Sequence, residues 1–72
     1  MQYSQRLKDL REDADKKQAD IADFLKTTQS YYAQYENGKR EMPFSRAIEL
    51  AKYYNVSLDY LAGLIDTPRK LH

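Results

Sequence analysis

The segment of residues 18–40 constrains the fold more than any other part of the chain. Its apolar residues recur three or four positions apart in two short blocks, the spacing of one face of a helix. Lys26-Thr27 separates the blocks, and Asn37-Gly38 after the second block supplies the left-handed residues with which helices commonly stop. The segment therefore predicts two short helices joined by a tight turn.

The second of these helices, residues 28–36, has an unusual outer face. Tyr32 and Tyr35 occupy its apolar positions, and Thr28 is placed to cap its start. Uncharged side chains that form hydrogen bonds are expected on the outer face: Gln29, Ser30, Tyr31 and Gln34. An ordinary solvated face is usually charged. Gln pairs with adenine through two hydrogen bonds, and hydroxyl groups contact several base edges, so this face favours reading of the DNA major groove. On composition alone, the alternative that these residues form an ordinary solvated helix face stays open.

Composition argues against several other classes of protein. The 72 residues contain no Cys, and the one His is His72, so we expect no disulfide and no metal site. No Ser-His-acid set and no glycine-rich phosphate loop is visible, so we expect no enzyme, no catalytic residue and no cofactor. No apolar run approaches the ~20 residues of a membrane span, and Met1 leads into charged sequence. We therefore expect a cytoplasmic protein without membrane contact.

The charge distribution is compatible with nucleic acid but does not demand it. The formal net charge of the whole chain is only +1. Residues 26–46 carry four cations against two carboxylates, so the modest positive excess lies on the proposed reading segment. A strongly basic surface, which is the usual footprint of a nucleic-acid-binding domain, is absent from this pattern.

Three more helices are predicted around the central pair. Residues 3–13 place Tyr3, Leu7 and Leu10 on one stripe, and Ser57 caps a short helix at residues 57–63. Between them, a helix with Pro43 in its first turn has an apolar stripe of Phe44, Ala47, Ile48, Ala51 and Tyr54. No strand pattern appears. The expected fold is all-α, a compact bundle of five short helices.

The boundaries of the domain follow from these helices. We expect one domain at residues 1–65, a reading unit at 17–36, and a flexible tail at 66–72. The start of the reading unit has the form of a capping box, with Asp15 as the N-cap and Gln18 three residues later.

The residues described so far resemble the helix-turn-helix of the phage repressor and Cro type, the Xre family, over about residues 3–63. The most specific part is the combination of Gln18 and Ala22 with the run of residues 35–39, Tyr-Glu-Asn-Gly-Lys. Further matching residues are Leu7, Leu10, Arg11, Ile21, Leu25, Thr28, Arg40, Ala51, Val56, Ser57, Leu58, Asp59 and Leu61. The resemblance implies sequence-specific binding of double-stranded DNA by a small transcriptional regulator, a repressor that occupies a promoter and reads the major groove with helix 28–36.

The resemblance also implies roles for individual residues. The base-reading positions are Gln29, Ser30, Gln34 and Tyr31. The phosphate-binding positions are Gln18, Thr28, Asn37, Gly38, Lys39 and Arg40. A structural ion pair joins Arg11 to Glu36. The sequence departs from the family pattern at Lys26, where a glycine is usual, and at Tyr32 and Tyr35, where aliphatic residues are common. For Gln18, a DNA contact and a capping role both stay open.

One such domain reads few base pairs, so useful specificity implies a homodimer on a near-palindromic operator. Candidate residues for the two-fold contact are Leu58, Leu64, Ile65 and Leu71. Two alternatives to an autonomous regulator stay open. One is an antitoxin or protein-interaction module with a protein partner, and the other is the excised DNA-binding domain of a longer regulator.

Overall fold

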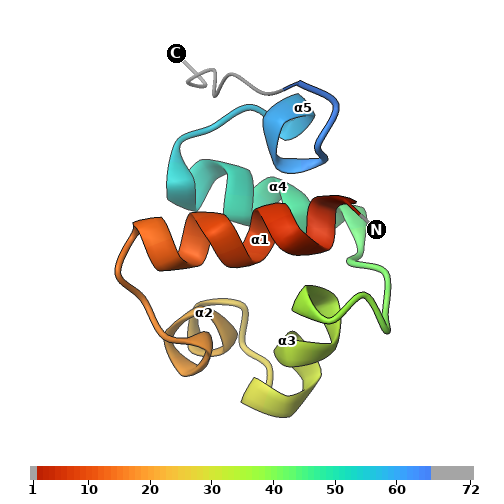
Figure 1. Ribbon diagram of the computed structural model, residues 1–72. Coiled ribbons are helices and arrows are strands. Elements are labelled where there is room, and N and C mark those ends of the chain that lie inside the picture. Colours follow the sequence, from red (N-terminus) through yellow and green to blue (C-terminus); the bar gives the residue numbers. More distant parts are fainter. Residues whose placement is uncertain (1, 66–72) are drawn as a thin grey trace.

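The computed structural model describes residues 2–65, which form five helices without a strand among them (Figure 1). The helices are α1 (Gln2–Asp13), α2 (Gln18–Phe24), α3 (Gln29–Glu36), α4 (Phe44–Tyr54) and α5 (Leu58–Leu61). The predicted all-α, five-helix fold is confirmed. The predicted tail at 66–72, and with it Leu71 and His72, lies outside the described residues.

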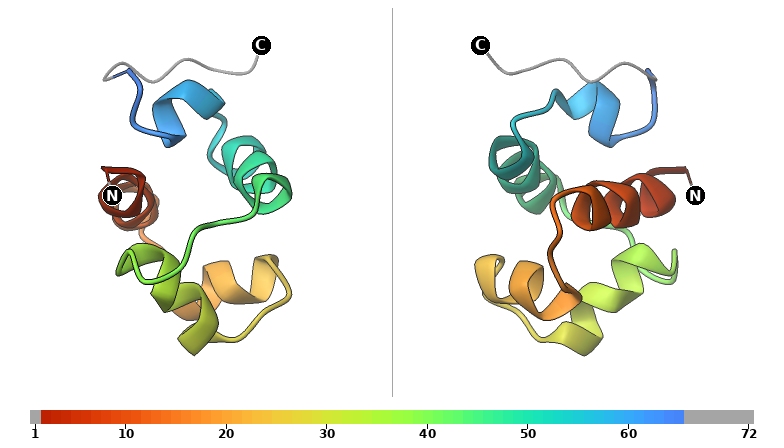
Figure 2. Two further views of the ribbon diagram at one scale, coloured as in Figure 1. Left: turned by 90° about the vertical axis from the view of Figure 1, so that its right-hand side faces the viewer. Right: turned by 60° about the vertical axis from the view of Figure 1, so that its left-hand side comes forward.

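The helices are arranged around α1. Helices α2 and α3 lie together on one side of α1, and α5 lies on the other (Figure 1). Turning the molecule shows α1 and α4 at the same level, with α5 above them and the α2–α3 pair below (Figure 2). The α2–α3 pair therefore forms one end of the domain.

The core is drawn from all five helices. Its buried apolar residues are Leu7, Ile21, Ala22, Leu25, Tyr32, Tyr35, Leu50, Ala51, Val56 and Leu61. Tyr32 and Tyr35 of α3 have no exposed surface, and neither do Leu7, Ile21 and Leu50. Burial of a large apolar side chain stabilises a fold by about 1.5–3 kcal/mol. The inner face of α3 is thus held firmly, which fixes where its outer face points.

All five helices end in the same way, with one left-handed residue. These residues are Asp15, Lys26, Gly38, Asn55 and Gly63, with φ between 56° and 83°. After each of them the chain turns back, and the next amide donates to a carbonyl five residues earlier, as Lys39 does to Gln34 at 2.9 Å. In this Schellman arrangement the last carbonyls of the helix are satisfied, which explains how five short helices stop within so few residues.

The start of α2 differs from the prediction. Asp15, at φ 58°, is the left-handed residue that ends α1, and Lys17 stands at the N-cap position. The backbone N–H of Lys17 donates to the Asp20 carboxylate at 2.9 Å. The predicted capping box of Asp15 and Gln18 is therefore wrong, because Asp15 is already engaged in stopping the preceding helix.

The stripe predicted for α4 is also wrong in part. Phe44 is 70% exposed, whereas Leu50, which the predicted stripe omits, is fully buried. The stripe that faces the core runs through Ala47, Leu50, Ala51 and Tyr54, at i, i+3, i+4 and i+7. The predicted stripe shares Ala47, Ala51 and Tyr54 with the observed one, and this overlap explains the error. Pro43 occupies the N-cap position, one residue before the helix.

Arg6 of α1 holds the end of α5 through a contact that no local pattern predicts. Its guanidinium donates to the carbonyl oxygens of Tyr60 at 3.0 Å and Ile65 at 3.2 Å. It also lies 4.1 Å from the centre of the Tyr60 ring. A helix of four residues is too short to be stable by itself, so this anchor and the burial of Leu61 hold α5 in place.

The turn between α2 and α3 stores strain at Lys26, whose φ is 59°. A residue with a Cβ adopts this region at a cost of about 1–2 kcal/mol, and glycine avoids that cost. We expect Lys26→Gly to raise the free energy of unfolding by about 1 kcal/mol, measured by urea denaturation followed by circular dichroism. The matched control is Lys8→Gly, since Lys8 is exposed within α1, where glycine costs about 1 kcal/mol. Destabilisation by both changes would contradict the assignment of strain to position 26.

Candidate nucleic-acid interface

Thr28 follows the tight turn after α2 and lies at the start of α3. Its hydroxyl oxygen accepts a hydrogen bond from the backbone N–H of Tyr31 at 3.1 Å, as an N-cap does. The helix that follows therefore begins at Gln29. Ile21 of α2 and Tyr32 of α3 are buried in the same core. The turn between the two helices therefore sets the direction of α3.

The outer face of α3 presents uncharged polar groups to solvent. Gln29 and Ser30 are exposed, Tyr31 is 36% exposed, and Gln34 is half-buried. Together they offer amide and hydroxyl donors and acceptors along two turns of a helix, the chemical groups that pair with base edges. An α-helix fits the major groove of B-DNA, so this face is of the right size and chemistry for it.

Behind this face, the carboxylate of Glu36 is buried and accepts four hydrogen bonds. Arg11 binds it through two nitrogens, with Nε 2.8 Å from Oε2 and Nη2 3.2 Å from Oε1. The hydroxyl of Tyr32 donates to Oε2 at 2.6 Å, and the amide of Gln18 donates to Oε1 at 3.1 Å. This cluster connects α1, α2 and α3 through a single side chain.

The hydrogen bonds decide the charge state of Glu36. Burial raises the pKa of its carboxyl group, but the hydrogen bonds from Arg11, Tyr32 and Gln18 outweigh burial and leave the pKa below its ordinary value. Conversely, burial, together with the neighbouring carboxylate, raises the pKa of the Tyr32 hydroxyl, which stays protonated and donates. At neutral pH the site is an ionised carboxylate held by four donors.

Gln18 thus has a partner inside the domain. Its amide nitrogen is directed to Glu36, while the side chain stays half-buried. The amide nitrogen carries a second N–H, and a phosphate oxygen needs such a donor. The amide can therefore support the α2–α3 pair, and a contact with DNA phosphate is still a prediction.

A second cluster lies on the side of α3 where the chain leads to α4. The guanidinium of Arg40 lies 4.6 Å from the centre of the Tyr31 ring, and its Nε donates to the Gln34 side-chain oxygen at 3.2 Å. Arg46 of α4 lies 5.7 Å from the same ring and donates to the Tyr35 hydroxyl at 2.8 Å. Two arginines therefore flank Tyr31, and each also bonds to a different residue of α3.

The predictions from the sequence did not include the contacts of Arg46. Its partner Tyr35 is eleven residues away along the chain, and no local pattern links the two. The hydroxyl of a fully buried tyrosine does need a partner, which is the one available signal. The contact brings a cation from α4 to the edge of the α3 face.

The loop after α3 holds the remaining predicted residues. Asn37, Lys39 and Arg40 are exposed, and Gly38, with φ 75°, is the left-handed residue of the turn. The backbone N–H groups of Lys39 and Arg40 both donate to the carbonyl oxygen of Gln34, at 2.9 and 3.2 Å. The loop is therefore tied back to α3, and its cations stay close to the outer face of that helix.

Two absences apply to the part of the chain that the structure describes. Within residues 2–65 there is no group of three or more His, Cys, Asp or Glu side chains that could hold a metal ion. None of the five described helices is long and apolar enough to cross a membrane.

Two short helices at a tight turn, with a polar outer face and flanking cations, define the class of helix-turn-helix DNA-binding domains. The family model described as "Helix-turn-helix" matches residues 7–61. The chain belongs to this helix-turn-helix family, and its predicted resemblance to the phage repressor type is confirmed.

A curated relative is also described as a helix-turn-helix protein. The chain is 35% identical over 66 residues to a protein of Bacillus subtilis (strain 168) described as "Uncharacterized HTH-type transcriptional regulator YobD". The match covers 92% of this chain and 59% of the relative, so the chain spans about three fifths of that protein's length. No solved structure matches the chain significantly.

Proposed function

We propose that this domain is a transcriptional regulator that binds a specific site on double-stranded DNA by placing α3 in the major groove. The observation that carries the proposal is the uncharged outer face of α3, which is formed by Gln29, Ser30, Tyr31 and Gln34. On the inner side of the helix, the buried carboxylate of Glu36 holds α3 in place. A fixed helix whose outer face presents amide and hydroxyl groups suits base recognition, because its side chains are already directed outward. The relative's description as a transcriptional regulator agrees with this role.

The remaining predicted contacts complete the interface. Thr28 at the start of α3 and the loop of Asn37, Gly38 and Lys39 are proposed to bind the phosphates on either side of the groove. Phosphate contacts fix the register of a reading helix without carrying sequence information. Lys39 is exposed, and its backbone N–H is bonded to the Gln34 carbonyl, so its cation stays close to the end of α3. Repression by occupation of a promoter is the simplest outcome of such binding.

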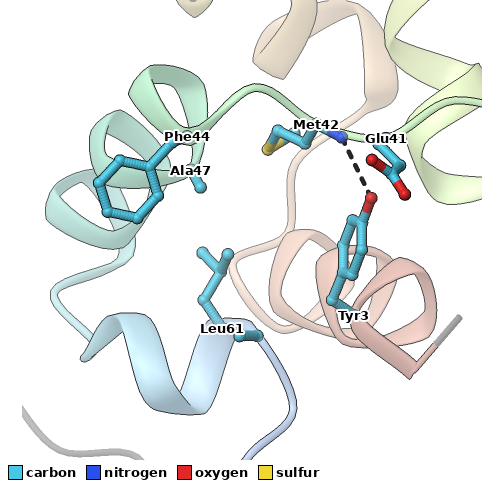
Figure 3. A pocket seen from close by; sticks show the side chains of 7 residues that line it. Tyr3, Glu41, Met42, Phe44, Ala47 and Leu61 are labelled. Atoms are coloured by element: carbon cyan, nitrogen blue, oxygen red, sulfur yellow. Dashed lines mark hydrogen bonds between the residues drawn. The ribbon is translucent and has the colours of Figure 1, made fainter.

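A homodimer on a near-palindromic operator is the second part of the proposal. A two-fold contact needs exposed apolar surface away from α3, and Leu64, among the candidates, is 75% exposed. Leu58 and Ile65 are half-buried. Phe44 borders a groove of about 360 Å³ between the starts of α1 and α4 and the end of α5, beside Tyr3 and Leu61 (Figure 3). This end of the molecule offers the apolar surface that a second subunit would cover.

The test is selection from a library of random DNA duplexes with the purified protein at low salt. We expect enrichment of a near-palindrome whose half-sites are spaced by about one helical turn, ~10 base pairs. Enrichment of a single short half-site would support DNA reading but contradict the homodimer. Absence of any enrichment would reject the DNA-binding proposal and leave protein interaction, as in an antitoxin, as the better account.

A further inference from the structure

We infer that Arg40 is a positioning residue for Gln34, which it turns so that the amide reads a guanine rather than an adenine. The inference rests on the proposed function, because it names the base that one position of the DNA-reading face selects. It departs from the sequence-based expectation in two respects. Arg40 acts on the reading residue instead of on a phosphate, and Gln34 does not use the two-bond pairing with adenine.

The geometry fixes which end of the amide points to Arg40. The Nε of Arg40 lies 3.2 Å from Oε1 of Gln34. A guanidinium has only donors, so the amide atom that faces it has to be the oxygen. The amide nitrogen of Gln34 therefore points away from Arg40, and its two N–H donors are the part of the amide that Arg40 leaves unengaged.

Arg40 is itself held in this position from two sides. Its backbone N–H donates to the Gln34 carbonyl at 3.2 Å, which ties residue 40 to the last turn of α3. Its guanidinium lies 4.6 Å from the centre of the Tyr31 ring, a cation–π contact. Tyr31 and Gln34 are three residues apart and share one face of α3, so a guanidinium on the ring lies beside the amide. Arg40 thus restrains Gln34 before any DNA binds.

The orientation of the amide sets its preference among bases. Adenine presents an acceptor and a donor in the major groove, and glutamine satisfies both only if its own oxygen is directed at the base. Guanine presents two acceptors side by side, N7 and O6, and needs donors alone. The oxygen of Gln34 keeps a second lone pair, but it is already engaged by a cation, whereas Arg40 leaves the N–H groups unengaged and polarises them. The amide therefore matches the two acceptors of guanine better than the donor and acceptor of adenine.

The molecule offers a matched control in Arg46. It flanks the same Tyr31 ring at 5.7 Å and carries the same charge, but its hydrogen bond goes to the Tyr35 hydroxyl. Removing Arg46 removes one cation from the edge of the interface without touching Gln34. A third variant, Arg40→Lys, keeps the charge at position 40 but lacks the planar fork that stacks on a ring while donating from Nε.

The experiment compares Arg40→Met, Arg40→Lys and Arg46→Met with the native protein, first by selection and then by titration of defined duplexes. The position of the DNA site at which Gln34→Ala loses its base preference is the position that Gln34 reads. The native protein is expected to select guanine there. In both Arg40 variants, the ratio of affinities for guanine-bearing and adenine-bearing duplexes should fall about fivefold or more, the worth of roughly one hydrogen bond. Arg46→Met should weaken binding to both duplexes equally and keep the ratio.

Several results would overturn the inference while the proposed function stands. One is native selection of adenine at the position in question, and another is a Gln34→Ala variant that relaxes no position. A third is an Arg40→Met variant that weakens all duplexes alike, which would make Arg40 a charge contact only. If the native protein enriches no sequence, the proposed function fails and the inference fails with it. All variants change exposed or half-buried side chains, and their unfolding midpoints are measured alongside to show that they fold.

Discussion

Replacing Glu36 by Ala is expected to lower the free energy of unfolding by about 3–5 kcal/mol, the usual cost of removing one partner of a buried ion pair. The change leaves the guanidinium of Arg11, the hydroxyl of Tyr32 and the amide of Gln18 without their shared acceptor. A domain of this size has a total stability on the order of 4–11 kcal/mol. Urea denaturation should therefore show that the Glu36→Ala variant keeps little or none of the native free energy of unfolding, although the outer face of α3 is unchanged.

Glu49 supplies the control for this experiment. It is an exposed glutamate on α4, and Glu49→Ala should change the free energy of unfolding by no more than about 0.5 kcal/mol. Equal midpoints for the two variants would contradict the central role of the buried carboxylate. Glu36→Gln, which keeps the shape of the side chain and one oxygen acceptor, should fall between the native protein and Glu36→Ala.

The lowered pKa of Glu36 gives the same site a dependence on pH. In the native state the hydrogen bonds, which outweigh the effect of burial, hold the pKa below its value of 4.5 in a free side chain. The stability that this carboxylate contributes is therefore fully present above pH 4.5 and is lost as the pH falls through the lower, native pKa. Part of the acid destabilisation of the native protein should thus be missing from Glu36→Gln.

Replacing Gln29 by Ala is expected to weaken binding to the selected duplex about 5- to 150-fold for each half-site, which corresponds to about 1–3 kcal/mol. Gln29 is the first residue of α3 and is exposed, so the domain should keep its stability within about 0.5 kcal/mol. Fluorescence anisotropy with the native site, and with sites changed at single positions, separates lost affinity from lost base preference. The variant should become indifferent to the base at one position of each half-site.

The control for Gln29 is another exposed glutamine outside the reading face. Gln5 lies on α1, where its amide donates to Asp9, and Gln5→Ala should leave both affinity and base preference unchanged. A Gln29→Ala variant that binds the native site and all its changed forms as the native protein does would exclude Gln29 from the interface. Equal losses at every sequence would instead make it a phosphate contact.

The order of the helices and the outer face of α3 could be predicted from the sequence because they depend on residues no more than about four positions apart. Ser57 and Thr28 do cap the helices that follow them, and Gly38 is the left-handed residue that lets α3 stop. Overlapping stripes limit the same method. In α4, local spacing could not decide whether Phe44 or Leu50 faces the core, since both lie on plausible helical faces.

The spacing of residues along the chain is enough to predict an all-α domain whose α3 exposes uncharged polar groups. The contacts that restrain those groups depend on how the helices pack. This packing pairs Gln18 with Glu36, Arg46 with Tyr35 and Arg40 with Gln34. These partners are six to eighteen residues apart and meet because the chain turns sharply after α1, α2 and α3. Hydrogen bonds between separate elements depend on that packing, and no local periodicity encodes it.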